Sequence, residues 1–138
     1  SDKKNIIKFL LNFGTQLESS QFENLRISLG YPKFGNELTE DFNPLEALLI
    51  DHISFNKGCY IGQEVVARLN TYDKVQRQLV QISSNHPLGI GEIEFEGKTV
   101  GIITSAMQNN GIAYVNKKIL NETIQVQYGS FDVEIHPI

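Results

Sequence analysis

The stretch of sequence that decides the fold is residues 90–104, IGEIEFEGKTVGIIT. Two short runs rich in β-branched and aromatic residues, Ile90–Phe95 and Thr99–Thr104, flank the tripeptide EGK at 96–98. Two such runs joined by a short turn that contains glycine are typical of a β-hairpin, because glycine readily adopts the φ angles of tight turns. The stretch therefore predicts two antiparallel strands.

Four further runs of the same kind lie around this hairpin in the second half of the chain. They are Gln78–Ile82, Gly111–Val115, Thr123–Gln127 and Phe131–Ile135. Turns separate all six runs and no helix is predicted between them. Short strands with tight connections are typical of a small antiparallel barrel or sandwich. We therefore expect a small antiparallel β-barrel at the C-terminal end.

The first half of the chain has helical patterns instead. Residues 3–13 place apolar side chains around an unusually wide face of a helix, which indicates contacts on more than one side. A second helix is predicted to begin at Ser20, because Ser20 and Glu23 have the spacing of a capping box, and to end at Gly30. A third helix is predicted from Ile61 to Tyr72, where apolar residues recur every three or four positions.

Between the helices, residues 31–58 are rich in turn-forming residues, with one possible strand at Leu48–Ile53. The change from helical to β patterns near residues 73–77 predicts two units, at 1–73 and 74–138. The fold class is therefore α+β.

The composition is that of a folded globular protein, with 41% hydrophobic and 20% charged residues among 138. No run approaches the ~20 apolar residues of a membrane helix. The net charge is −4 and no basic cluster indicates a direct nucleic-acid partner. The only cysteine, Cys59, cannot form an internal disulfide. We expect a cytoplasmic protein, or one of the mitochondrial or plastid matrix in a eukaryote, without a membrane partner.

The most informative stretch for function is residues 57–64, KGCYIGQE. Gly58 permits a sharp turn that places Cys59 at the start of a helix. There, free amides and Lys57 would lower the pKa of the thiol, whereas Glu64 would raise it. Cys59 is thus a candidate functional thiol, although a buried structural role is the commoner fate of a free cysteine. A single cysteine cannot hold an iron–sulfur cluster, and no metal site is predicted.

Residues 57–68 resemble the K-G-C-Y-x-G-Q-E-x-x-x-R signature of the YgfZ-type folate-binding family, within the aminomethyltransferase (glycine cleavage T-protein) superfamily. The matching residues are Lys57, Gly58, Cys59, Tyr60, Gly62, Gln63, Glu64 and Arg68. Other segments resemble family boxes in the same order. They are 26–32 (R-x-x-x-G-x-P), 34–39 (F-G-x-E-L-T), 43–47 (N-P-x-E-A) and 101–105 (G-x-x-T-S). The resemblance covers the chain from about residue 20 onward.

This resemblance implies that residues 1–73 are the remnant of a central folate-binding α/β region, followed by the C-terminal barrel of the family. Members are usually at least twice as long, so we expect the N-terminal half of the folate cavity to be absent. The implied ligand is tetrahydrofolate or a derivative, with Arg26 and Tyr60 as candidate contacts. The implied role is a non-enzymatic factor that assists iron–sulfur cluster assembly or repair, with iron–sulfur client or assembly proteins as partners.

Other interpretations remain open. Arg26 is a candidate structural arginine that pairs with Glu46 or Glu64. The first alternative function is a tetrahydrofolate-dependent aminomethyltransferase. Those enzymes often have an acidic residue at the position of Ser28, and a serine cannot bind a pterin ring as a carboxylate does. The second alternative is an interaction module in which Cys59 is structural.

Overall fold

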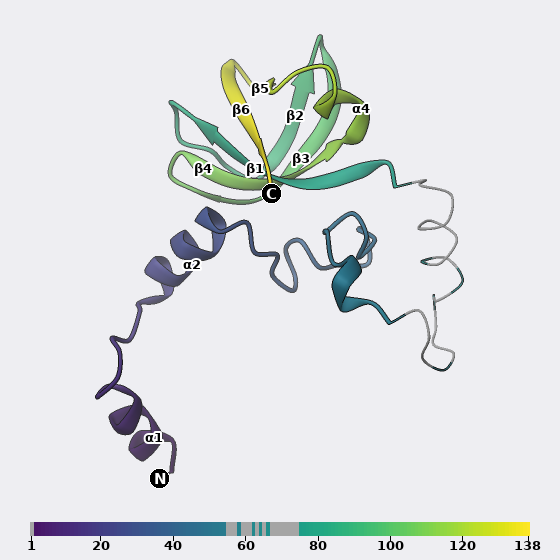
Figure 1. Ribbon diagram of the computed structural model, residues 1–138. Helices are drawn as coiled ribbons and strands as arrows, with labels where there is room; N and C mark the ends of the chain where they lie inside the picture. Colours follow the sequence, from purple (N-terminus) through teal and green to yellow (C-terminus); the bar gives the residue numbers. More distant parts are fainter. Residues whose placement is uncertain (1, 55–57, 59–61, 63, 65, 67–74) are drawn as a thin grey trace.

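The computed structural model describes residues 2–54, 58, 62, 64, 66 and 75–138. The helical elements are α1 (Asp2–Leu10), α2 (Ser19–Ser28), η1 (Ile50–His52) and α4 (Lys117–Leu120). The strands are β1 (Arg77–Ser84), β2 (Gly91–Phe95), β3 (Lys98–Met107), β4 (Asn110–Asn116), β5 (Gln125–Tyr128) and β6 (Phe131–Pro137). Figure 1 shows the strands gathered at one end of the molecule and α1, α2 and the loops at the other. The predicted α+β class is confirmed.

The six strands close into an antiparallel barrel in the order β1-β4-β3-β2-β5-β6, and β6 pairs back with β1. Each predicted β run overlaps one strand, although Ile90 lies outside β2 and Thr123 and Ile124 lie outside β5. The predicted hairpin is β2–β3, and its two turn residues, Glu96 and Gly97, have φ angles of 51° and 73°. Positive φ at both central residues is the pattern of a type I′ turn, which matches the twist of paired strands. The short helix α4 between β4 and β5 was not predicted.

The barrel interior is filled by small and medium apolar side chains. They are Val80, Ile82, Ile93, Ile103, Ala113, Val115, Val126, Val133 and Ile135, none more than 2% exposed. Gly101 allows β3 to pass close to β4 at this core. A Cβ atom on Gly101 would lie only 2.4 Å from the carbonyl oxygen of Tyr114. No side chain fits there, so the close approach depends on glycine.

Helix α2 packs against the outside of the barrel on β3 and β4. Ile27 from α2 and Ala47 from the following loop meet Leu79, Ile112 and Tyr114 in a second apolar cluster. The side-chain nitrogen of Gln81 also donates to the carbonyl oxygens of Ile27 and Ser28, at 2.9 and 2.8 Å. This cluster fixes the end of α2 on the barrel.

The predicted end of α2 is confirmed, and its predicted start is wrong. Gly30 has φ +69° and its N–H donates to Ile27, while the Tyr31 N–H donates to Arg26, which is a Schellman motif. At the other end the helix begins at Ser19 rather than Ser20. The N-cap is Glu18, whose backbone N–H donates to the Gln21 side chain at 2.9 Å. Glu18 and Gln21 have the same i, i+3 spacing as the predicted pair.

The predicted strand at Leu48–Ile53 is also wrong. Asn43 and Pro44 start a series of turns that continues into this segment. The Leu48 N–H donates to the Leu45 carbonyl and the Leu49 N–H to the Pro44 carbonyl. These local bonds use the amides that a strand would offer to a neighbour. The segment continues into the single turn of η1.

The predicted helix at residues 3–13 corresponds to α1, which ends earlier, at Leu10, and the apolar side chains of this segment are exposed. Ile6, Phe9, Leu10 and Phe13 are each more than half exposed. No helix among the described residues has the length and apolarity to cross a membrane. The division of the chain into units near residues 73–77 stays a prediction.

Candidate functional site

The residues of the sequence motif lie only partly within the described chain. Lys57, Cys59, Tyr60, Gln63 and Arg68 lie outside it, so their predicted roles stay predictions. The predicted helix at 61–72 also falls largely outside it.

The described motif residues show left-handed geometry followed by helix. Gly62 has φ +87°, in the region that favours glycine. The N–H of Val66 donates to the Gly62 carbonyl at 3.1 Å, and Glu64 and Val66 are helical. The motif glycine therefore has a conformational role.

Gly62 and Val66 line a cavity of about 600 Å³ between the 39–46 loop and the start of β1. The cavity wall also includes Thr39, Asp41, Phe42, Asn43, Glu46 and Arg77. Thr39 belongs to the 34–39 box, Asn43 and Glu46 to the 43–47 box, and Gly62 to the motif. Three segments that the sequence singled out therefore meet at one cavity.

The cavity wall combines an aromatic ring with charged groups. The Arg77 guanidinium pairs with Glu46, with Nε–Oε1 at 3.0 Å and Nη2–Oε2 at 3.2 Å, and lies 5.0 Å from the centre of the Phe42 ring. The Phe42 ring is supported by the barrel, because it stacks on the ring of Tyr114 in β4 with the ring centres 3.9 Å apart. The wall thus consists of a paired arginine and glutamate beside an aromatic ring that is held against the barrel.

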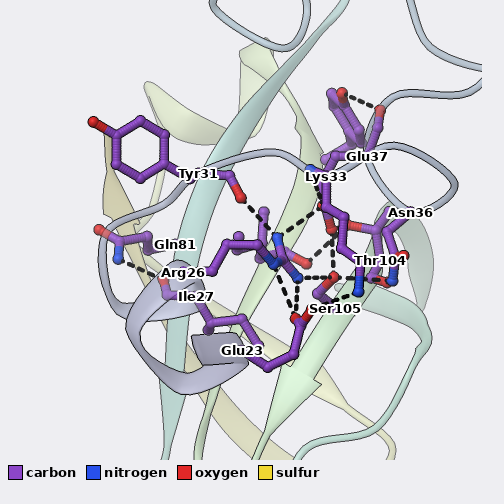
Figure 2. Close-up of polar contacts among 12 residues, drawn as sticks. Glu23, Arg26, Ile27, Tyr31, Lys33, Asn36, Glu37, Gln81, Thr104 and Ser105 are labelled. Atoms are coloured by element: carbon purple, nitrogen blue, oxygen red, sulfur yellow. Dashed lines mark hydrogen bonds and ion pairs between the residues drawn. The ribbon is translucent and has the colours of Figure 1, made fainter. Parts of the chain in front are cut away.

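A polar cluster with a buried centre lies beside this loop, shown in Figure 2, and we call it the Glu37 cluster: Glu23, Arg26, Lys33, Asn36, Glu37, Thr104 and Ser105. Its centre is Glu37, whose side chain is fully buried. Glu37 Oε1 accepts from the hydroxyls of Thr104 at 2.7 Å and Ser105 at 2.6 Å. Oε2 accepts from Arg26 Nη1 at 3.0 Å and from the Lys33 backbone N–H at 2.9 Å. The buried charge is thus compensated.

Arg26 is almost fully buried and all three of its nitrogens bind protein groups. Nε donates to Glu23 at 2.9 Å, Nη1 to the Tyr31 carbonyl at 2.7 Å, and Nη2 to Ser105 Oγ at 2.7 Å. The predicted structural role is confirmed. The predicted partner Glu46 is wrong, because Glu46 pairs with Arg77. A contact between Arg26 and folate stays a prediction.

Two pKa shifts follow from this arrangement. The hydrogen bond from the Lys33 ammonium, with the nearby Arg26 guanidinium, holds the pKa of Glu23 below its usual 4.5. Burial, and next the charge of Glu37, raises the pKa of Tyr114 above its usual range. The Tyr114 hydroxyl therefore stays a hydrogen-bond donor, and it donates to the Glu37 backbone carbonyl at 2.9 Å.

Sequence reasoning did not identify Glu37, Thr104 or Ser105 as a cluster. Each lies in a segment that resembles a family box, 34–39 or 101–105, and this was the available signal. Thr104 and Ser105 carried no predicted role beyond that resemblance. Their common partner is 67 and 68 residues away in the chain.

No protein-family model matches the chain. The chain is 41% identical over 107 residues to the "Putative transferase, chloroplastic" of Arabidopsis thaliana, which covers 72% of this chain and 25% of that protein. It is 31% identical over 126 residues to the tRNA-modifying protein YgfZ of Blochmanniella pennsylvanica, and this match covers 78% of this chain and 38% of that protein. It is 30% identical over 105 residues to an aminomethyltransferase of Caldanaerobacter subterraneus, at 70% and 28% coverage. The chain thus spans between a quarter and two fifths of the length of these relatives. With its antiparallel barrel, the chain belongs to the family of YgfZ and the aminomethyltransferases.

Proposed function

We propose that the chain is part of a folate-binding factor that assists the assembly or repair of iron–sulfur clusters. The observation that carries this proposal is the cavity at which three family segments meet. An aromatic wall flanked by charged groups suits tetrahydrofolate or a derivative, since a folate has a flat, polar ring system. The resemblance to YgfZ-type proteins supplies the iron–sulfur role, and client or assembly proteins would be its partners.

The residue roles in this proposal follow from the motif and the geometry. Cys59 is the functional thiol, which would bind an iron–sulfur cluster transiently or together with ligands from a partner protein. Tyr60 and Arg26 stay the folate candidates, and Tyr60 is the first of them because the nitrogens of Arg26 already donate to protein groups. The net charge of −4 favours an indirect link to any nucleic acid. We place the protein in the cytoplasm or, as for the chloroplastic relative, in an organelle.

A second candidate is a tetrahydrofolate-dependent aminomethyltransferase, supported by the relatives of that name. The surroundings of Ser28 bear on this candidate, because aminomethyltransferases often have an acidic residue at that position. Ser28 is exposed and its hydroxyl donates to the Leu25 carbonyl of its own helix at 2.8 Å. The residue does not line the cavity near Gly62. Transfer of a glycine-derived methylene group to tetrahydrofolate would identify this activity directly.

The proposed function can be tested with a chimera in which this chain replaces the matching region of the Blochmanniella YgfZ. Titration calorimetry with 5-formyltetrahydrofolate should show binding, and Phe42→Ala should weaken it at least ~10-fold by removing the aromatic wall. The matched control is Phe131→Ala, because Phe131 is a partly exposed aromatic residue that stacks on His86. A folded chimera that binds no folate would contradict the ligand assignment.

The iron–sulfur role needs a separate measurement in cells that lack their own YgfZ-type protein. Expression of the chimera should restore the activity of iron–sulfur enzymes, and Cys59→Ser should fold normally yet restore little. Full restoration by the serine variant would show that the thiol is dispensable.

A further inference from the structure

The hydroxyl pair that holds Glu37 depends on an irregularity in β3. In a regular strand, successive side chains point to opposite faces, so neighbours cannot share a partner. The pairing of β3 with β4 shifts its register between Ile103 and Ser105, as in a β-bulge. Thr104 and Ser105 therefore both reach Oε1 of Glu37, and Figure 2 shows them converging on it.

Stability alone does not account for this arrangement. Taking a carboxylate fully out of water is costly, and apolar residues of similar volume commonly stabilise a fold as well as a buried ion pair does. The four donors around Glu37 add something that apolar packing lacks, namely a fixed position for the residue. Hydrogen bonds to two hydroxyls, a guanidinium and a backbone amide allow one placement of the carboxylate.

Tyr114 connects this fixed position to the cavity. Its hydroxyl donates to the Glu37 backbone carbonyl, and its ring stacks on Phe42 in the cavity wall. Further along the loop, Glu46 is paired with Arg77 at the start of β1. The loop that forms one wall of the cavity is thus attached to the barrel at Glu37, Phe42 and Glu46.

We propose that Glu37 is a positioning residue, which sets the placement of the 38–46 loop around the cavity through the hydroxyls of Thr104 and Ser105. The effect on the loop is a property of the chain without any ligand. Only its consequence for ligand binding rests on the proposed function.

Hydrogen exchange measured by NMR on the 138-residue chain tests the proposal without a ligand. The probes are the amides of Glu46 and Ala47, which donate within the loop to Asn43 at 2.9 and 3.3 Å. Thr104→Val removes one hydroxyl at nearly constant shape and should accelerate exchange at these amides about 10-fold, while the Val80 amide in β1 is unchanged. Thr104→Ser keeps the hydroxyl and should restore slow exchange.

The matched control is Thr123→Val, because the bonds of the Thr123 hydroxyl among the described residues are local ones to Gln125. Acceleration at loop and barrel amides alike, or at neither, would show that the hydroxyl has at most a general stabilising role and would overturn the proposal. If Thr104→Val does not fold, the same exchange rates are measured for Ser105→Ala, which removes the other hydroxyl that binds Glu37.

The folate-binding chimera adds a distinguishable result. There, Thr104→Val should raise the dissociation constant for 5-formyltetrahydrofolate and Thr104→Ser should not. An unchanged constant would refute the link between loop placement and ligand. Absence of binding by the unmodified chimera would refute the proposed function, and hydrogen exchange would still decide the role of Glu37.

Discussion

Replacement of Arg26 by methionine measures what the buried ion pair contributes to folding. Methionine keeps an unbranched apolar side chain but removes every N–H donor, so the fully buried Glu37 loses its compensating charge. Removal of one partner from a buried pair typically costs about 3–5 kcal/mol. Because the whole stability of a domain is about 5–15 kcal/mol, we expect Arg26→Met to lose about a fifth of it or more.

Urea unfolding followed by circular dichroism gives this loss directly, and the melting temperature should fall by about 10 °C. The matched control is Arg77→Met. The Arg77 side chain is 40% exposed, whereas its partner Glu46 is 9% exposed. Water can replace part of the lost contact at the exposed side, so a smaller loss of about 1–3 kcal/mol is expected. The double variant Arg26→Met with Glu37→Leu should recover part of the loss, because no buried charge remains. Equal effects of the two arginine variants would refute the reasoning.

Three further predictions concern other parts of the chain. Gly101→Ala should destabilise the barrel by about 1–3 kcal/mol in urea unfolding, because its Cβ would lie 2.4 Å from the Tyr114 carbonyl oxygen; unchanged stability would contradict the close approach of the strands. Alkylation of Cys59 by iodoacetamide should have a midpoint below the free-thiol pKa of ~8.5, and a midpoint at or above it would favour the structural role. Because the pKa of Glu23 is lowered in the folded chain, its pair with Lys33 stabilises above pH 4.5 and is lost as pH falls through the lowered value. Glu23→Gln should therefore lose less stability than the unmodified chain as the pH falls from 4.5 through the lowered value, and parallel curves would contradict this.

The features that could be predicted from the sequence are those set by neighbouring residues. The β2–β3 hairpin follows from Glu96 and Gly97, because a two-residue turn with positive φ is a local property. Gly30 ends α2 for the same kind of reason. Local signals also misled where two of them competed, as at Leu48–Ile53, where turns begun by Asn43 take the amides that a strand would use.

The family signature is likewise a property of the sequence alone, because it depends on residue identity and spacing. Similarity to YgfZ and aminomethyltransferases over most of the chain agrees with it. The role of Cys59 within that signature stays a prediction.

Only the tertiary structure decided which polar residues meet. Arg26 and Ser105 are 79 residues apart in sequence, and Glu37 joins them only because α2, the loop and the bulged β3 pack together. A buried Glu37 carboxylate without hydrogen-bond partners would be costly, and this cost arises only once the chain is folded. The sequence therefore determined the hairpin, the helix end and the family, whereas packing determined the partners of Arg26 and the walls of the cavity.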